Sequence, residues 1–198
     1  MSHTDDLVRQ AADGNMGAFA YLVQTHRASV LRVAHGIVGN AHDAEDVGQA
    51  TFVKVWQNLD GYRPGSTFSA WLHRITVNAA LDKLRSRREE TPLTERERDD
   101  RPTPERAILQ DEMQTRVRRA VQALPPQSRA ALVLREYEGL SYKEIAEALD
   151  IPIGTVMSRL SYARRALRER LAGHREQDVD TAVMDMPDLE TAGAITRQ

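Results

Sequence analysis

Apolar residues in this chain recur every three or four positions, which is the spacing of one helix face, and no alternating run typical of a strand stands out. Residues 16–38 carry a broad apolar face, with Asn15 placed to cap its start and Gly39 to end it. Further helical patterns occupy residues 41–59 and begin again at Thr67, after a turn rich in glycine and proline. The pattern predicts an all-α fold without strands.

The sharpest local pattern lies in residues 140–171 and predicts two short helices joined by a tight turn. Ser141 and Glu144 have the spacing of a capping box, and Thr155, after the break at Pro152, is placed to cap the second helix. The predicted inward stripe of that helix consists of Val156, Leu160, Ala163, Leu167 and Leu171. The predicted outer face consists of Met157, Ser158, Arg159, Ser161, Tyr162, Arg164, Arg165 and Arg168. This combination favours a DNA-reading helix-turn-helix over an ordinary hairpin with a solvated basic face.

Composition divides the chain into two helical modules. Residues 89–106 contain three prolines, dense mixed charge and almost no apolar side chains, which predicts a flexible linker. It separates a module over residues 1–88 from a second, four-helix module with the helix-turn-helix over residues 107–172. Residues 173–198 are acidic and weakly patterned, so we expect a disordered tail.

Charge is distributed unevenly between these parts. The net charge is -2, yet residues 117–172 hold ten Lys and Arg against six acids, and residues 173–198 hold six acids against two arginines. Clustered positive charge is what phosphate binding requires, so the second module is expected to contact nucleic acid.

Other chemistry finds little support in the sequence. The chain has no cysteine, and its six histidines show no spacing typical of a metal site or a catalytic triad. We therefore expect no metal, no cofactor and no enzymatic activity. The polar N-terminus and the lack of a long apolar stretch predict a cytoplasmic protein without direct membrane insertion.

The first module combines a polar helix face with a basic aromatic edge. Within residues 41–59 the side away from the apolar stripe is polar and suited to docking a partner. Three aromatic residues, Tyr62, Phe68 and Trp71, lie close in sequence to a group of basic residues. In such an arrangement, nucleic-acid bases stack on the aromatic rings and phosphates pair with the basic side chains. Phe68 and Trp71, three residues apart, are expected to serve mainly as core, which leaves Tyr62 as the better stacking residue. The basic residues are Arg74, Lys83, Arg85, Arg87 and Arg88.

Three ordered blocks resemble successive regions of one family. They read DAEDVGQATFVKVWQNL, YRPGSTFSAWLHRITVNAALDKLRSRR and LPPQSRAALVLREYEGLSYKEIAEALDIPIGTVMSRLSYARRAL. Together they resemble the extracytoplasmic-function (ECF) group of sigma-70-type RNA polymerase sigma factors over roughly residues 15 to 172. The resemblance implies an alternative sigma factor that binds the clamp and flap of core RNA polymerase, opens promoter DNA at the minus-10 element and reads the minus-35 element as duplex. It also implies an anti-sigma factor as partner.

The resemblance assigns residues to each task. The polymerase-binding set would be Asp43, Glu45, Asp46, Gln49 and Phe52. The minus-10 set would be Tyr62, Arg63, Ser66, Thr67, Phe68, Trp71, Arg74, Asn78, Lys83 and Arg85. The minus-35 set would be Thr155, Ser158, Arg159, Ser161 and Tyr162, with phosphate contacts from Arg164, Arg165 and Arg168.

Some positions depart from the family pattern. Gly48 stands where a branched residue is common and Ala50 where a carboxylate is common, so we expect weaker binding to the clamp. Met157 stands where Lys or Arg is usual, and Ser161 and Tyr162 replace a pair that commonly ends in Arg. These changes predict a different minus-35 preference and a shallower salt dependence, by about one unit of slope for each lost phosphate contact.

The main alternative is a free-standing dimeric helix-turn-helix regulator with an effector-binding N-terminal module. Such a regulator binds duplex DNA as a dimer by itself, whereas an isolated sigma factor is expected to bind duplex promoter DNA poorly. The acidic tail has two open interpretations. It either competes with DNA for the arginines of the second module or is an inert chain end.

Overall fold

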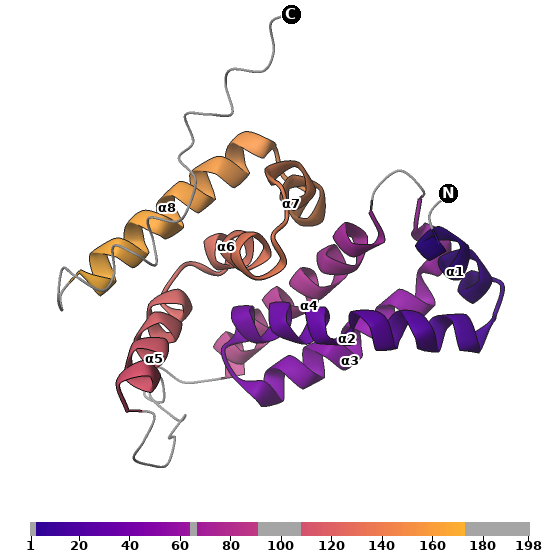
Figure 1. Cartoon of the computed structure of the whole chain (residues 1–198), viewed down its shortest axis with the longest axis horizontal. Helices are drawn as coiled ribbons and strands as arrows, with labels where there is room; N and C mark the ends of the chain where they lie inside the picture. The colour runs from indigo at the N-terminus through magenta and orange to yellow at the C-terminus, as the bar shows by residue number, and fades with distance from the viewer. Residues whose placement is uncertain (1–2, 64–66, 91–107, 173–198) are drawn as a thin grey trace, which may run out of the picture.

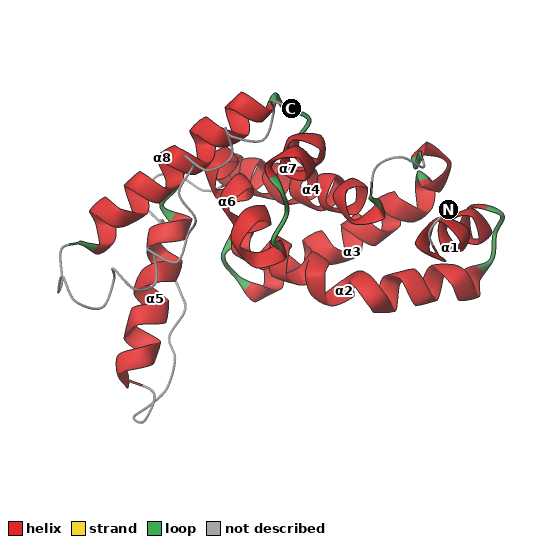
Figure 2. Cartoon of the chain, turned by 45° about the horizontal axis from the view of Figure 1, so that its top comes forward, coloured by secondary structure: helices red, strands yellow, loops and turns green. Residues whose placement is uncertain are grey.

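The computed structural model describes residues 3–63, 67–90 and 108–172, and every regular element in these ranges is helical (Figure 2). The first half of the chain (Figure 1) comprises α1 (His3–Ala12), α2 (Met16–Val38), α3 (Ala41–Gln57), the 3-10 helix η1 (Leu59–Gly61) and α4 (Phe68–Glu90). The second half comprises α5 (Ile108–Gln122), α6 (Pro126–Glu138), α7 (Tyr142–Leu149) and α8 (Ile153–Leu171). The predicted all-α fold, with a second group of four helices, is confirmed. None of the helices in the described ranges has the length and apolar composition of a membrane span.

Several helix ends lie where the sequence predicts them, because local capping groups determine them. The Asn15 side chain accepts a hydrogen bond from the Ala18 amide at 3.1 Å and starts α2. Gly39 ends α2 in the left-handed region at a φ of 88°, where a residue without Cβ is unstrained. In α7, Glu144 N–H donates to Ser141 Oγ at 3.3 Å, and Ser141 N–H donates to the Glu144 carboxylate at 2.9 Å, which confirms the capping box.

Two features near helix starts differ from expectation. The predicted cap at Thr155 is wrong, because α8 begins at Ile153 and the Thr155 N–H already donates to the carbonyl of Pro152 at 2.9 Å. Pro152, with a φ of -59° fixed by its ring, is the N-cap, so the helix starts at Ile153 before Thr155 is reached. The helix α1 was not predicted, although Val8 and Ala11 are buried three residues apart on one of its faces.

The boundary between the predicted modules also differs slightly. Glu89 and Glu90, which the sequence places in the linker, are the last residues of α4. The rest of the predicted linker up to residue 106, and the acidic tail over residues 173–198, lie outside the described residues.

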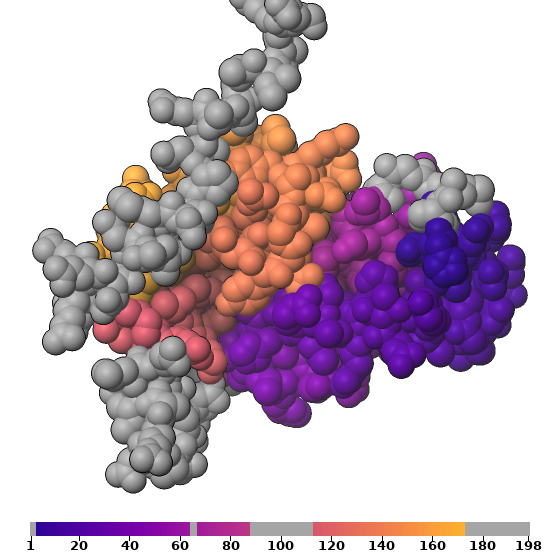
Figure 3. Space-filling model, viewed as in Figure 1, coloured from indigo at the N-terminus to yellow at the C-terminus, as the bar shows by residue number. Residues whose placement is uncertain are grey.

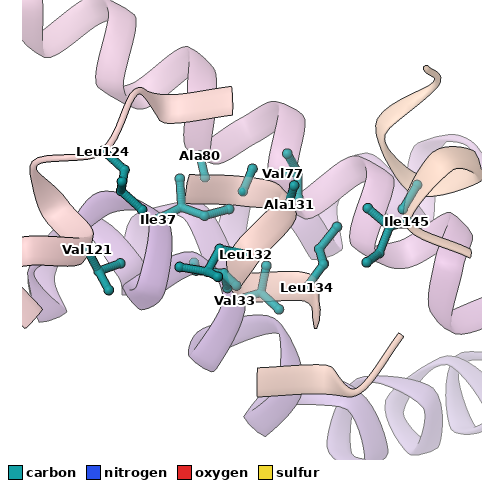
Figure 4. Packing of buried hydrophobic residues seen from close by; sticks show 14 of the residues in the cluster. Val33, Ile37, Val77, Ala80, Val121, Leu124, Ala131, Leu132, Leu134 and Ile145 are labelled. Atoms are coloured by element: carbon teal, nitrogen blue, oxygen red, sulfur yellow. The ribbon is translucent and has the colours of Figure 1, made fainter. Parts of the chain in front are cut away.

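The two halves of the chain share a hydrophobic core. Ile37 of α2 and Val77 of α4 lie in one buried cluster with Leu132 and Leu134 of α6 and Ile145 of α7 (Figure 4). In the space-filling view the second half lies directly on the first (Figure 3). A separate cluster, which includes Leu22 and Leu72, packs α1 and η1 against α2 and α4. The helices α6 and α7 are therefore held against α2 and α4.

Candidate nucleic-acid interface

The outer face of α8 presents polar and basic side chains, while its other face is buried. Val156, Leu160, Ala163, Ala166 and Leu171 are the buried residues of this helix. Leu167, expected in the buried stripe, is half-buried. Exposed on the opposite side are Met157, Ser158, Ser161, Tyr162, Arg165 and Arg168. This face matches most of the predicted minus-35 set in position.

Two arginines of α8 bind neighbouring helices instead of facing outward freely. Arg164 is expected on the outer face, and this is wrong, because its side chain is only 13% exposed and its Nη2 lies 3.4 Å from the Glu136 carboxylate of α6. Position 164 is one turn beyond the buried Leu160, so the aliphatic stem of Arg164 follows the edge of the core. Arg159 is half-buried and donates from Nη1 to the side-chain oxygen of Gln127 on α6 at 3.1 Å. Thr155 is also half-buried.

Residues assigned to polymerase binding and to DNA binding meet in one ion cluster between α3 and α4. Lys83 Nζ lies 3.3 Å from Asp43 Oδ1 and 2.9 Å from Asp46 Oδ2, and Arg87 Nη1 lies 3.5 Å from Asp43 Oδ2. Burial alone would raise the pKa of Asp43, but hydrogen bonds from Asn40 and Lys83 outweigh it and lower that pKa. The pKa of Lys83 is raised by its hydrogen bonds to Asp46 and Asp43. These charges stabilise the packing of α3 on α4.

The outward side of α3 keeps polar groups and also exposes apolar ones that sequence reasoning missed. Gln49 is exposed, and Glu45 pairs with Arg27 at 3.1 Å. Val53 and Trp56 are large apolar side chains that are 55% and 38% exposed. The helical signal is that Val53 and Trp56 both lie on the side of α3 away from the line of buried residues Val47, Thr51 and Val55. Phe52 is half-buried.

Gly48, from which the sequence predicts weaker clamp binding, is buried where α3 packs on α2. A Cβ at this position would lie 2.9 Å from Leu31 Cδ2, so the glycine leaves room for the Leu31 side chain between α2 and α3. Ala50, the other departure on this helix, is exposed.

The aromatic residues near the start of α4 pack against one another. Ring centroids of Tyr62, Phe68 and Trp71 lie 5.7 Å apart in each pair. Phe68 is buried and Trp71 half-buried, in line with their expected core role. Tyr62 is half-buried and donates its hydroxyl proton to Asp5 of α1 at 2.8 Å. Burial, followed by this hydrogen bond to Asp5, raises the pKa of Tyr62 to about 12.

The remaining predicted minus-10 residues are spread along the surface of the loop and α4. Arg63 and Thr67 are exposed, and Ser66 lies outside the described residues. Arg74, Asn78 and Arg85 are exposed on α4. Arg85 pairs with Asp82 at 3.2 Å on its own helix. Arg74 Nη2 lies 3.1 Å from the carboxylate of Asp150, at the end of α7 in the other half of the chain.

The described residues contain no cluster of His, Asp and Glu that could hold a metal ion. The site therefore consists of hydrogen-bonding, cationic and aromatic groups on helical surfaces, which suits recognition of other macromolecules.

Comparison with known proteins gives the family. Residues 22–90 match the model of Sigma-70 region 2, and residues 114–167 match that of Sigma-70, region 4. The ECF RNA polymerase sigma factor SigE of Mycolicibacterium smegmatis is 40% identical over 172 residues, covering 84% of this chain and 66% of SigE. The ECF RNA polymerase sigma factor SigW of Bacillus subtilis is 30% identical over 176 residues, covering 83% of this chain and 94% of SigW.

A solved structure gives the same answer. The sigma factor RpoE from Bartonella quintana, in a co-crystal with the anti-sigma factor NepR, is similar with a TM-score of 0.64 and 27% sequence identity, covering 79% of this chain and 98% of RpoE. The helical surfaces described above and these matches define a transcription initiation factor.

The chain belongs to the ECF group of the sigma-70 family of RNA polymerase sigma factors. It is an alternative sigma factor, which binds core RNA polymerase and directs it to promoter DNA for transcription initiation. The comparisons give no support to the alternative of a free-standing dimeric regulator. Sigma factors are generally non-enzymatic regulators.

Proposed function

We propose that α8 reads the minus-35 element and that α3 and the α4 region serve polymerase docking and minus-10 recognition. The observation that supports this most directly is the two-sided character of α8, with a buried apolar face and an exposed polar and basic face. A helix of this kind enters the major groove with its first turns against base edges. The protein then works in the cytoplasm by binding and orienting DNA, without catalysis or a cofactor.

The contacts of α8 suggest how its residues divide the task. Ser158, Ser161 and Tyr162 are exposed near its start and are proposed to meet base edges. Arg165 and Arg168, exposed further along, are proposed to meet phosphates. The hydrogen bond that Arg159 donates to Gln127 supports a fixed direction for its guanidinium, and the contact with Glu136 leaves Arg164 a structural role.

For polymerase docking, the support comes from the outward side of α3. Gln49, Val53 and Trp56 are exposed there, and the ion cluster already occupies Asp43 and Asp46. We propose that this mixed polar and apolar face contacts the clamp. An interface with exposed aromatic and aliphatic anchors surrounded by polar groups is the usual composition of such contacts.

The minus-10 task is proposed for the loop at 60–67 and the exposed side of α4. The packing of Tyr62 on Phe68 and Trp71 supports a firm base for that loop, and Arg74 and Asn78 continue along α4. An anti-sigma factor is proposed as a further partner, because the similar RpoE was solved in complex with one.

The test is run-off transcription with bacterial core RNA polymerase on a library of promoter fragments, with and without this protein. Discrete start sites that depend on the protein are expected. The double variant Ser161→Ala with Tyr162→Ala is expected to shift the selected minus-35 sequences, whereas Arg9→Ala, an exposed arginine on α1, is expected to leave them unchanged. Absence of initiation with the unmodified protein would overturn the proposal.

A further inference from the structure

The arrangement of the two halves is tightly fitted and bears on how the protein works. A Cβ at Gly36 of α2 would lie 2.9 Å from Val133 Cγ2 of α6, so the two helices touch backbone to side chain. Val133 itself is fully buried. Contacts this close are typical of a protein interior and not of two domains that touch loosely.

This arrangement brings together surfaces that the proposed function requires to lie far apart. Arg74 of the minus-10 helix lies 3.1 Å from Asp150, three residues before α8 begins. Elements named for positions minus-10 and minus-35 lie about 25 base pairs apart, which is about 85 Å along a duplex. The described arrangement therefore cannot contact both elements at once, and we refer to it as the closed state.

A polar cluster crosses the interface beside the shared core. It consists of Ser29 and Arg32 on α2, His73 on α4, and Glu138 on α6. Ser29 Oγ donates to Glu138 Oε2 at 2.6 Å and lies 2.9 Å from His73 Nε2. Arg32 donates from Nε to Glu138 Oε1 at 3.1 Å. The side chains of His73 and Glu138 are only 1% and 9% exposed.

The hydrogen-bond directions in this cluster are mutually consistent. The single hydroxyl proton of Ser29 is donated to Glu138, so His73 Nε2 must carry the proton shared with Ser29. His73 Nδ1 then accepts, and Ser69 Oγ lies 3.4 Å from it. Burial lowers the pKa of His73, which favours this neutral form. Glu138 is the member of this cluster from the second half, so its bonds to Ser29 and Arg32 exist only while the two halves are together.

We propose that Ser29, Arg32, His73 and Glu138 form an autoinhibitory latch that holds the chain in the closed state. This inference rests on the proposed function, because it is the separation of the two promoter elements that makes the closed state inactive. When the latch opens, Glu138 and Arg32 regain water, and the DNA-reading surfaces of α4 and α8 can separate. Core polymerase binds only the open state. The apparent affinity for core polymerase is therefore the affinity of the open state multiplied by the fraction of molecules that are open, and the latch lowers that fraction.

The chain offers a matched pair of arginines for the test. Arg32 and Arg27 are both on α2, with side chains 54% and 59% exposed. Arg32 pairs with Glu138 across the interface, whereas Arg27 pairs with Glu45 within the first half. Arg32→Ala and Ser29→Ala are therefore the test variants, and Arg27→Ala is the control for loss of a charge on the same helix.

The first measurement is the distance between the two halves in the full-length protein. Because the chain has no cysteine, single cysteines at the exposed positions Gln24 and Lys143 can carry spin labels or fluorophores. The unmodified protein and Arg27→Ala are expected to give one short distance. Arg32→Ala and Ser29→Ala are expected to add a longer-distance population at unchanged helix content by circular dichroism.

The second measurement is the affinity for bacterial core RNA polymerase by fluorescence titration. Arg32→Ala and Ser29→Ala are expected to bind about two- to tenfold more tightly than Arg27→Ala, because more molecules are open. Distance distributions equal to that of Arg27→Ala would overturn the latch. Longer distances without tighter binding would overturn its inhibitory role. Failure of every variant to bind polymerase would instead overturn the proposed function, and the distances would still report on the latch.

Discussion

At the scale of single residues, Arg129 carries a buried charge that helix ends neutralise. Its Nη1 donates to the carbonyl of Ile37 and to the side-chain oxygen of Gln122, each at 2.6 Å. Its Nη2 donates to the carbonyl of Leu124 at 3.0 Å and to that of Gln122. Burial lowers the pKa of Arg129 to about 10, so the guanidinium stays charged at neutral pH. The C-terminal ends of α2 and α5 carry partial negative charge, which compensates it.

Replacing Arg129 by methionine should therefore destabilise the whole molecule. The variant leaves several buried carbonyl groups without donors, and we expect a loss of about 3 kcal/mol in the free energy of unfolding. Urea denaturation followed by circular dichroism measures this loss. Arg118→Met, on the exposed surface of α5, is the control and should stay within about 0.5 kcal/mol of the unmodified protein. Equal stability of the two variants would show that the Arg129 contacts are not stabilising.

His73 gives the molecule a pH dependence. Burial is the main cause that lowers its pKa, partly opposed by Glu138 and reinforced by His26 and Arg32. The folded protein therefore binds a proton on His73 less readily than the unfolded chain, whose ordinary value is 6.5. Stability from this residue is fully present above pH 6.5 and is lost as the pH falls below it.

We expect the free energy of unfolding to decline between pH 7 and pH 5, by about 1.4 kcal/mol for each pKa unit by which the two states differ. The variant His73→Gln keeps a neutral donor but cannot titrate, so its profile should be flatter over the same range. Denaturant titrations at several pH values provide the measurement. A profile for His73→Gln as steep as that of the unmodified protein would assign the effect to other groups, of which His26 is the first candidate because burial lowers its pKa too.

At the scale of elements, α8 allows the structural and the DNA-binding arginines to be separated. Arg168 is exposed, whereas Arg164 is largely buried against Glu136. Arg168→Ala should lower the slope of log affinity against log salt by about one for minus-35 duplex bound to the polymerase complex. Arg164→Ala should leave that slope unchanged and lower the unfolding free energy instead. A slope change of equal size in both variants would contradict the assignment of Arg164 to the structure.

The helices themselves could be predicted well wherever a local group determines their ends. Each capping group acts within a few residues of the helix end that it determines, so its effect can be predicted from the local sequence. This holds for Asn15, Gly39 and the pair of Ser141 and Glu144. The predicted cap of α8 was wrong because Pro152, three residues before Thr155, already takes the N-cap position. The sequence placed Arg164 on the outer face because helical periodicity gives only the position of its Cα and Cβ atoms. The guanidinium lies several bonds away and turns back to Glu136 of α6.

The candidate site was predictable only in part for a related reason. The sequence assigns Asp43 and Lys83 to different partners, yet they bind each other, because a strong ion pair between α3 and α4 depends on how the helices cross. Val53 and Trp56 were overlooked because their exposure follows from the angle at which α3 packs, and not from their chemistry.

At the scale of the whole molecule, the closed state was the feature least accessible from sequence. Ser29 and Glu138 are 109 residues apart along the chain, and no periodic pattern connects them. Composition correctly indicated two groups of helices, because patterning and charge are properties of each segment. Whether those groups pack together depends on the fit of two surfaces, and that fit involves Val33 and Ile37 on one side and Val133 on the other.

The fit between α2 and α6 yields a final prediction that does not involve the latch. A methyl group at Gly36 would lie 2.9 and 3.0 Å from the two methyl groups of Val133, which is fully buried and cannot rotate away, and 3.0 Å from Tyr137. Within α2 alone, alanine favours the helix by about 1 kcal/mol over glycine, so the first half is not weakened. Gly36→Ala should therefore separate the halves without unfolding them, and the labelled pair at Gln24 and Lys143 should show a longer distance. Gly154→Ala, where the added carbon would meet nothing within 4 Å, should keep the short distance. If Gly36→Ala also keeps the short distance, the side chain of Val133 can move to accommodate the added methyl group. The close packing of α2 on α6 would then not be what holds the closed state.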